Sequence, residues 1–477
     1  MDRLNTPRIQ KFLSSPLGAV TATGPFESLK MRSLPRQFAG YRLRAAADVA
    51  LGSGPEAFLR EADAPPAPHL HDRIEAALAR YAEVREAYEE VTERWEAVFW
   101  GDADAGPDRR VALERERRRI SDAHARPDDL FGFIARDHHV PPVKYDVPDP
   151  SDAAGKWARE LADPDRLYGF SDATVTEALP RVTRSATVHG PGTTEFRLRF
   201  ETPALHVGDT ATARVYEPDD AEGDLPTFVF YGGLASLGDL AGYWPEEEAV
   251  GRRLAREGYR VVLPDAPWHA HREPRGRYSG EPYLARAPVG MFELYAAASK
   301  EAGVFVDWAR TEGAPRVGVG GLSLGGTVAL HVAGHCDLWA ESMRPDFVAP
   351  IGMPGAIDQT ITSSRLGDAV ELGDALSAAG WTGRHLREFA PLLNPPADPA
   401  LDPERILVVY GSDDDVAPTE TAEALVRRWR LPRRNVSEWD GGHFGVLSRL
   451  IRGDAYQRTV ARELDRQTAR AETAPTV

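Results

Sequence analysis

The sequence has one cysteine, Cys336, and no long hydrophobic run. A lone cysteine cannot form an intrachain disulfide, and a secreted chain of this size more often carries a pair, so a reducing cytoplasm fits best. The apolar residues near the start are interrupted by Ser, Pro and Gly, and they lack the hydrophobic core of a signal peptide. No run approaches the roughly 18 apolar residues of a membrane span. We therefore expect a soluble, cytoplasmic protein without a membrane span.

Basic residues are in the minority. The 57 Lys and Arg stand against 73 Asp and Glu, which gives a formal net charge of −16. A surface of that sign repels phosphate backbones and anionic lipid headgroups, so we expect no nucleic acid as a partner. Phosphate-binding and dinucleotide-binding motifs are also absent. The closely spaced glycines of VGVGGLSLGG suit a different turn, described below.

Two regions with different patterns meet near residue 184. In residues 1–183, apolar side chains recur every three or four positions between His71 and Trp100, which is the spacing of one helical face. They are Ile74, Leu78, Tyr81, Val84, Tyr88, Val91, Trp95 and Val98. A second, charged helix is expected from Arg109 to His124. The repeat is only about four heptads long, so we favour packing within the molecule over a coiled coil between chains.

The remainder of the first region has a mixed pattern. Residues 1–65 and 126–184 contain many Pro and Asp, and we expect loops and short helices there. Residues 1–183 are thus predicted to be a mainly helical N-terminal domain. Two roles stay open for it: a lid over a site, or a surface for homo-oligomerisation.

After residue 184, short β-rich runs alternate with helical stretches. The expected strands are SATVH, TEFRLRFE, TATARVYEP, PTFVFYGG, RVVLPD, RVGVGG, FVAPIG, ILVVYG and NVSEWD. The expected helices are Glu246–Arg256, Met291–Arg310, Leu324–Ala333, Leu366–Ala379, Glu420–Trp429 and Phe444–Asp465. The early strands lack long crossovers and should form antiparallel hairpins. The pattern predicts an α/β domain in residues 184–466, with a mostly parallel sheet flanked by helices, and a disordered tail in residues 467–477.

The motif with the most chemical content lies between an apolar strand and an apolar helix. There the residues Gly321-Leu322-Ser323-Leu324-Gly325 form GxSxG in the strand, turn and helix context of a nucleophile elbow. The sharp turn strains the nucleophile's backbone, and the small flanking residues leave room for strand and helix to approach. The Ser323 hydroxyl would then lie at the positive end of a helix, where a developing oxyanion is stabilised.

A serine hydroxyl is a poor nucleophile at neutral pH. It needs an imidazole to take its proton, and that imidazole needs a carboxylate to fix its tautomer. The run ILVVYGSDDDVAP places acids just beyond a strand, and NVSEWDGGHFG places His443 after the next strand. The chain order Ser323, Asp414, His443 therefore predicts a catalytic triad.

Residues from about 184 to 465 resemble the α/β-hydrolase superfamily, and in particular its serine esterases. The segments GLSLGG, GSDDDVAP and GGHFG match the family in order and in strand context. The resemblance implies that the acid stands fourth in a GxxDxxxP stretch, which is the position of Asp414. Asp413 and Asp415 stay open as neighbours. Some branches place the acid after the preceding strand, where Asp358 stands.

The resemblance also implies an oxyanion hole made of two backbone N–H groups. Leu324, which follows the nucleophile, supplies the first. The family's HG step appears here as Tyr231-Gly232, so Gly233 is the expected second donor, with Leu234 as the alternative. The replacement of His by Tyr leaves the detailed geometry of this loop open.

A further segment, LPDAPWHAHREP, follows the next strand. Its Asp265, Pro267, His269 and Arg272 resemble a DxPxHxxR stretch of esterase-like and dienelactone-hydrolase-like branches. His269 and His271 either line a pocket or hold this loop by hydrogen bonds, and we favour the second. A zinc site is disfavoured because no third ligand has a recognisable spacing.

The candidate substrate pocket is drawn from loops at strand ends. Its expected residues are Leu234, Trp268, His269 and Phe444, with Trp244, Met291, Phe292 and Met353 as further candidates. The chain between Asp358 and Ile406 is long enough for a modest lid of helices.

These residues predict the hydrolysis of a small-molecule acyl substrate, with no metal or organic cofactor. A carboxylic ester is the favoured substrate. A peptidase, thioesterase, acyltransferase or carbon–carbon bond hydrolase would use the same triad, because neither fold nor triad sets the scissile bond. A non-catalytic binding or assembly module on the same scaffold is the third alternative.

Overall fold

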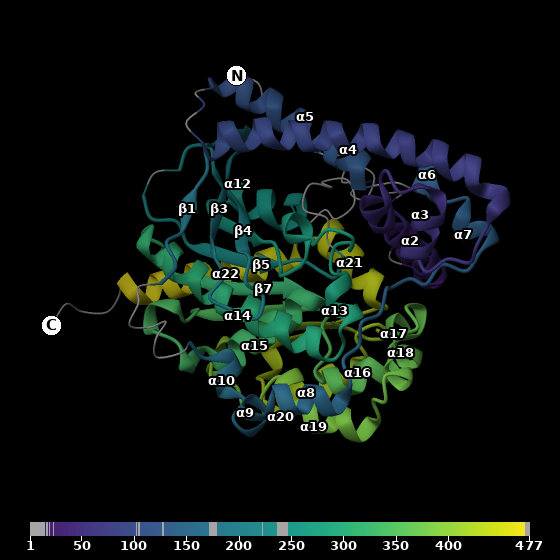
Figure 1. Cartoon of the computed structure of the whole chain (residues 1–477). Coiled ribbons are helices and arrows are strands. Elements are labelled where there is room, and N and C mark those ends of the chain that lie inside the picture. Colours follow the sequence, from purple (N-terminus) through teal and green to yellow (C-terminus); the bar gives the residue numbers. More distant parts are fainter. Residues whose placement is uncertain are drawn as a thin grey trace.

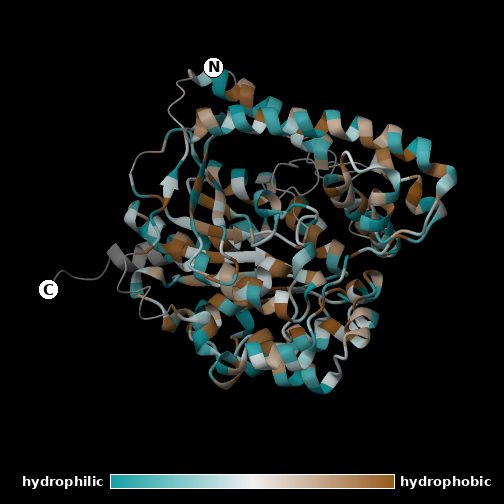
Figure 2. Ribbon diagram, viewed as in Figure 1, coloured by the Kyte–Doolittle hydropathy of each residue, from teal (hydrophilic) through white to brown (hydrophobic). Residues whose placement is uncertain are grey.

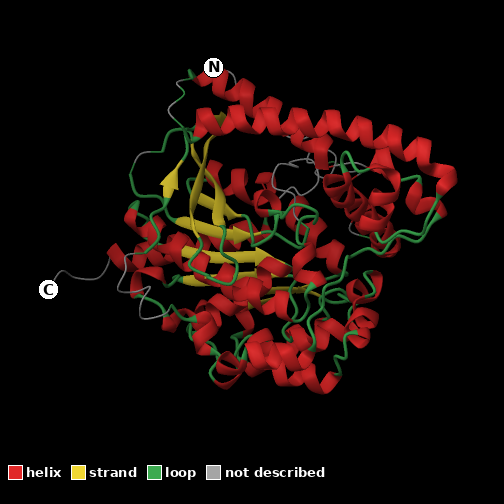
Figure 3. Ribbon diagram, viewed as in Figure 1, coloured by secondary structure: helices red, strands yellow, loops and turns green. Residues whose placement is uncertain are grey.

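The computed structural model describes residues 15, 18, 20–21, 23–101, 103, 105–125, 128–170, 179–221, 223–235 and 247–472. Within these residues, one mixed sheet runs through the molecule and carries helices on both faces (Figure 3). The helices of the N-terminal region lie beside the sheet, and the long helix α4 crosses the top of the view (Figure 1).

The sheet has ten strands in the described part of the chain. They are β1 Thr183–Arg184, β2 Val188–Gly190, β3 Thr193–Glu201, β4 Thr210–Pro218, β5 Thr227–Tyr231, β6 Arg260–Pro264, β7 Val317–Leu322, β8 Phe347–Ile351, β9 Val408–Gly411 and β10 Val436–Trp439. Their order is β1-β3-β4-β6-β5-β7-β8-β9-β10, with β2 on β3. Pairing is antiparallel from β1 to β6 and parallel from β6 to β10. The predicted α/β class and its antiparallel start are confirmed.

Helices cover both faces of the sheet because successive strand side chains point to opposite sides. In β5, Val229 and Tyr231 pack in the core with α14 and α15, whereas Phe228 and Phe230 pack in a second core with α21 and α22. The helices of these two layers are α14 Val289–Thr311, α15 Leu324–His335, η3 Glu247–Arg252, α12 Arg253–Arg256, α21 His443–Arg452 and α22 Ala455–Glu472.

Shorter helices lie in the segments that connect the strands. They are η4 Ala270–Arg272, α13 Glu281–Ala285, η5 Cys336–Leu338, η6 Glu341–Met343, α16 Ile357–Ser363, α17 Arg365–Ala369, α18 Leu372–Ala378, α19 Gly383–Leu393, η7 Pro403–Arg405, α20 Thr419–Arg428 and η8 Arg433–Asn435. Helices α16 to α19 occupy the segment in which a modest lid was expected.

Two segments that we predicted to be single helices each contain two helices in the structure. The helix expected over Leu366–Ala379 is interrupted at Glu371, whose backbone has a φ of 60°. The helix expected over Phe444–Asp465 ends at Arg452, and a new one begins at Ala455. In both cases the apolar spacing continues across a short break in the backbone.

The N-terminal region is helical. Its elements are α2 Gly24–Ala50, α3 Gly54–Glu61, η2 Pro68–Leu70, α4 His71–Phe99, α5 Pro107–Ala125, α6 Asp128–Phe131, α7 Ile134–Asp137, α8 Pro150–Lys156, α9 Ala158–Ala162 and α10 Asp165–Tyr168. Apolar and hydrophilic residues alternate along α4 (Figure 2). Its Ile74, Tyr81 and Trp95 are buried within the molecule, so the prediction that this stripe packs internally is confirmed.

The expectation of loops and short helices in residues 1–65 is wrong for one stretch, because α2 extends from Gly24 to Ala50. Most of residues 1–22 lies outside the described residues. Pro35 lies inside it, and a proline there removes one backbone hydrogen bond and hides the helix from the sequence pattern. The expected disordered tail is also partly wrong. Helix α22 continues to Glu472, and residues 473–477 lie outside the described residues.

A membrane-spanning length of apolar helix is not found among the described residues.

Candidate active site

Ser323 lies in the sharp turn between β7 and α15. Its φ of 57° and ψ of −114° are strained for a residue with a side chain. A Cβ on Gly321 would lie 2.3 Å from the carbonyl carbon of Gly325, and one on Gly325 would lie 2.2 Å from the carbonyl oxygen of Tyr231. Glycine at both positions therefore lets the strand and the helix approach each other at the serine, as the GxSxG spacing predicts.

His443 begins α21, and Asp414 lies in the loop after β9. The His443 Nδ1 is 2.8 Å from Asp414 Oδ2, so the carboxylate accepts a hydrogen bond from the ring. The other carboxylate oxygen accepts the backbone N–H groups of Val416 at 3.0 Å and Ala417 at 2.7 Å. With both oxygens held in this way and the side chain buried, the carboxylate fixes the orientation of the imidazole.

The other candidate acids face elsewhere. Asp413 is exposed. Asp415 pairs with Arg365 at 2.9 Å, and Asp358 accepts a hydrogen bond from the side-chain amide of Asn394 at 2.7 Å. The structure therefore brings the acid in the fourth position of GxxDxxxP to the imidazole.

The charge on His443 is favoured by its surroundings. Burial by itself lowers the pKa of this imidazole. The attraction and hydrogen bond of Asp414, followed by the charges of Glu27 and Asp415, outweigh burial and hold the pKa above its ordinary value. Such a histidine is a stronger base than a solvated one.

The two expected oxyanion donors lie on either side of Ser323. Leu324 is the first residue of α15, where a backbone N–H has no partner inside the helix. A Cβ on Gly233 would lie 3.7 Å from the Ser323 Cβ, so the Gly233 backbone is next to the nucleophile. The Gly325 N–H donates to the Gly232 carbonyl at 3.1 Å and ties this loop to the elbow.

Ser323 and His443 line a cavity of about 270 Å³. The predicted pocket residues Leu234 and Phe444 line it too. Its wall is otherwise mostly apolar and includes Leu322, Leu366, Val416, Leu447 and Ile451, as well as residues of α2. An apolar cavity that reaches a nucleophile suits an acyl or alkyl group.

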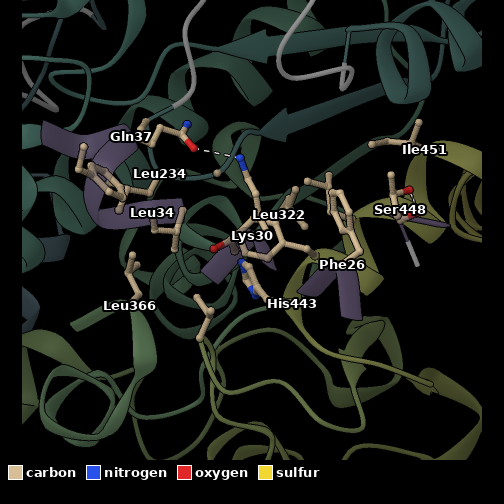
Figure 4. Close-up of a pocket in the computed structure, with 18 of the residues that line it drawn as sticks. Phe26, Lys30, Leu34, Gln37, Leu234, Leu322, Leu366, His443, Ser448 and Ile451 are labelled. Atoms are coloured by element: carbon tan, nitrogen blue, oxygen red, sulfur yellow. Dashed lines mark hydrogen bonds between the residues drawn. The ribbon is translucent and has the colours of Figure 1, made fainter. Parts of the chain in front are cut away.

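One side of this cavity comes from α2, which no motif predicted. Its lining residues Phe26, Lys30, Leu34, Gln37 and Tyr41 recur at intervals of three or four. Figure 4 shows the first four of them at the cavity. That interval is the signal of a helical face, but the proline in the helix obscured it. The structure thus places the N-terminal region directly against Ser323 and His443.

Polar groups within the apolar cavity are linked to one another. The Lys30 Nζ donates to the Gln37 Oε1 at 2.9 Å, and the Gln37 Nε2 donates to the Tyr41 hydroxyl at 2.7 Å. Burial lowers the pKa of Lys30 below its ordinary value. These three side chains give the α2 wall a polar stripe in an otherwise apolar surface.

A second, smaller cavity of about 70 Å³ also reaches Ser323. Met291, a further pocket candidate from the sequence, lines it together with Leu324. Leu234 and Leu366 line both cavities. The nucleophile therefore lies between a larger and a smaller apolar space.

Four described residues that we expected in the pocket do not line either cavity: Trp268, His269, Phe292 and Met353. Trp268 is buried, and Trp244 lies outside the described residues. His269 is fully buried, with its Nδ1 bonded to the Pro267 carbonyl at 2.9 Å. Phe292 packs edge-on against a tryptophan of the core.

Hydrogen bonds hold the loop after β6, as we favoured. The His271 Nδ1 bonds to Asp265 Oδ2 at 2.9 Å. The buried Arg272 donates to the Asp265 carbonyl at 3.0 Å and to both carboxylate oxygens of Glu301. The DxPxHxxR residues therefore fix the backbone next to the site.

Residues 232–455, which contain the elbow, Asp414 and His443, match the model described as the alpha/beta hydrolase family. The chain therefore contains an α/β-hydrolase domain. No relative among curated proteins matches this α/β-hydrolase.

Several solved structures are similar to this α/β-hydrolase. An acetyl xylan esterase from Paenibacillus sp. R4 is 15% identical, over 63% of this chain and 93% of that chain, with a TM-score of 0.45. An S-formylglutathione hydrolase from Agrobacterium tumefaciens is 16% identical over 58% and 98%, with a TM-score of 0.38. A Pyrobaculum calidifontis esterase is 18% identical over 68% and 94%, with a TM-score of 0.37. At these values we take nothing from them about the substrate.

Proposed function

We propose that the protein is a serine hydrolase that cleaves a small-molecule carboxylic ester. The observation that supports this most strongly is the cavity shared by Ser323, on a strained elbow, and His443, whose ring is held by Asp414. The chain order of nucleophile, acid and base, and an imidazole held by a carboxylate beside the serine's cavity, both suit acyl transfer.

In this proposal, His443 takes the proton of the Ser323 hydroxyl as its oxygen attacks the ester carbonyl. The Leu324 and Gly233 N–H groups stabilise the tetrahedral oxyanion. His443 then gives the proton to the leaving alcohol, and an acyl-enzyme remains. Water, deprotonated by the same imidazole, attacks the acyl-enzyme, and collapse of the second oxyanion releases the acid and the serine.

The shape of the site supports an ester with apolar substituents of unequal size. The cavity of about 270 Å³ has room for the larger substituent, and the one of about 70 Å³ for the smaller. Apolar walls favour carbon chains over sugars or charged groups in direct contact with the carbonyl.

A fluorophosphonate probe tests the nucleophile. We expect labelling of the wild-type protein that disappears in Ser323→Ala and falls sharply in His443→Ala. Ser363→Ala, at an exposed serine of α16, is the matched control and should label like the wild type. Folded wild-type protein that does not label would refute the proposal.

A substrate panel tests the scissile bond. We expect p-nitrophenyl esters of increasing acyl length to be hydrolysed faster than aminoacyl amides or thioesters. Turnover of amides without turnover of esters would contradict the proposed ester substrate, although it would leave Ser323 as the nucleophile.

A further inference from the structure

Glu27 of α2 contacts the start of α21, the helix whose first residue is His443. Its Oε1 accepts the backbone N–H of Phe444 at 3.1 Å, and its Oε2 accepts that of Gly445 at 3.0 Å. The first N–H groups of a helix have no partner inside the helix, and a carboxylate there is favoured by the helix dipole. The two carboxylate oxygens of Glu27 thus accept hydrogen bonds from the two residues that follow His443.

The same carboxylate also lies against the residue before His443. A Cβ on Gly442 would be 2.9 Å from the Glu27 carboxylate, so the backbone there is in close contact with it. Glu27 therefore contacts the backbone on both sides of His443. The two segments are far apart in the sequence, because 417 positions separate Glu27 from Phe444.

The charged groups around His443 come from two segments. Asp414 and Asp415 lie in the loop after β9, and Glu27 and Lys30 lie on α2, with the Lys30 Nζ 6.0 Å from the centre of the Phe444 ring. Burial raises the pKa of Glu27, while the Phe444 N–H and the charge of His443 oppose that rise. The charge of Glu27 in turn favours the imidazolium.

We propose that Glu27 is a positioning residue for His443, which holds the start of α21 in place and stabilises the imidazolium that forms when Ser323 is deprotonated. This proposal rests on the proposed ester hydrolysis. It makes the N-terminal helix α2 a working part of the active site, in addition to one wall of the cavity. Glu27 does not line the cavity, so its effect should fall on kcat and leave KM unchanged.

Three variants separate charge from hydrogen bonding. Glu27→Gln removes the charge and one acceptor, Glu27→Asp keeps the charge on a shorter side chain, and Glu27→Ala removes both. Glu56→Gln, at an exposed carboxylate in the first turn of α3, is the matched control. Each variant is compared by kcat and KM on a p-nitrophenyl ester between pH 5 and 9, after circular dichroism has shown that it is folded.

The expected result has two parts. The kcat of Glu27→Gln falls about tenfold at the plateau of its pH profile, with unchanged KM. Its acidic limb moves to lower pH, because loss of a nearby negative charge lowers the pKa of the imidazole that must be neutral to act as base. Glu27→Asp should lose kcat with a smaller movement of the limb, and Glu56→Gln should match the wild type.

The outcomes distinguish this proposal from the proposed function. If the wild-type protein neither labels nor hydrolyses esters, the proposed function fails. If the wild type is active and folded Glu27→Gln keeps its kcat and its acidic limb, only the role of Glu27 is refuted. If Glu27→Gln does not fold, Glu27→Asp tests the proposal in its place. An unchanged kcat in Glu27→Asp would also refute the positioning role of Glu27.

Discussion

The residues around Ser323 hold its backbone in the strained conformation that presents its side chain to the cavity. Its φ of 57° is held by the strand before it, the helix after it and the Ser323 N–H bond to the Ile351 carbonyl at 2.9 Å. Strain of this kind persists only where the surroundings impose it. At the scale of single residues, the glycines at 321 and 325 are therefore as necessary as the hydroxyl.

Asp414→Asn tests the acid at the same scale. The amide leaves the volume unchanged but can stabilise the wrong tautomer of His443, and in serine hydrolases this change costs about 10⁴-fold in kcat. We expect a loss of that order in ester hydrolysis, measured by steady-state kinetics.

Asp413→Asn is the matched control for this prediction. Asp413 is the exposed neighbour, and its replacement should leave kcat within about twofold of the wild type, since surface substitutions have small effects. Equal losses in the two variants would contradict the assignment of the acid.

At the scale of elements, helix α2 contributes residues to the cavity although it lies outside every catalytic motif. Its buried Met31, Leu34, Phe38 and Tyr41 belong to the same core cluster as α14 and α15. Phe38 and Tyr41 both pack on Tyr278 of the loop after β6. The helix therefore packs on the hydrolase layers and forms one wall of the cavity.

Leu34→Trp tests that wall. Leu34 is buried and lines the larger cavity, so a bulkier ring should fill space that a long acyl chain needs. We expect kcat/KM for a long-chain p-nitrophenyl ester to fall at least about tenfold while the acetate ester changes little.

The same helix supplies the control. Leu29→Trp changes a side chain that is 65% exposed, and it should leave the chain-length preference unchanged. An unaltered preference in Leu34→Trp would mean that the larger cavity does not hold the acyl chain.

At the scale of the whole molecule, one core crosses the expected domain boundary. The same cluster contains Leu34 from α2, Trp157 from the N-terminal region and Val319 from β7. The Arg42 and Glu281 side chains, both fully buried, form an ion pair at 3.0 Å between α2 and α13. Breaking a buried pair of this kind leaves an uncompensated charge and is strongly destabilising.

We therefore expect the full chain to unfold in one cooperative transition. Differential scanning calorimetry, with fluorophosphonate labelling followed along the same temperature ramp, measures this. A first transition that melts the N-terminal helices while labelling persists would contradict it and support two independent units.

Acid should destabilise the fold through buried histidines. Burial lowers the pKa of His335 to about 4, and burial and the charge of Arg272 lower that of His269 to about 4. Both stay neutral in the fold, while the unfolded chain gains their protons below about pH 6.5. Stability should thus fall between about pH 6.5 and pH 4, by at most about 1.4 kcal/mol per pH unit for each histidine.

His335→Phe checks this dependence. Phenylalanine keeps the ring stacked on Tyr168, whose centroid is 4.0 Å away, but cannot titrate. Thermal unfolding of this variant should depend less on pH over that range than the wild type does. His69→Gln, at an exposed histidine, should not change the slope.

The sequence by itself determined most of the strands, the presence of flanking helices and the elbow at Ser323. These features rest on contiguous residues, and parallel strands bring their carboxyl ends, with Asp414 and His443, to one edge of the sheet. The family resemblance favoured Asp414, but it left Asp413 and Asp415 open. Only the tertiary structure showed which of these adjacent carboxylates contacts His443, because that contact depends on how the loop after β9 folds.

The contact of Glu27 with the start of α21 was also beyond the sequence, since no local pattern connects residues 27 and 443. The sequence also could not show that Trp268 and His269, which we predicted to line the pocket, are buried away from it. Positive φ angles of 63° at Trp268 and 54° at Ala270 set where this loop points its side chains, and such angles are not visible in residue types. Local spacing fixes elements, whereas a cavity wall depends on how distant elements pack.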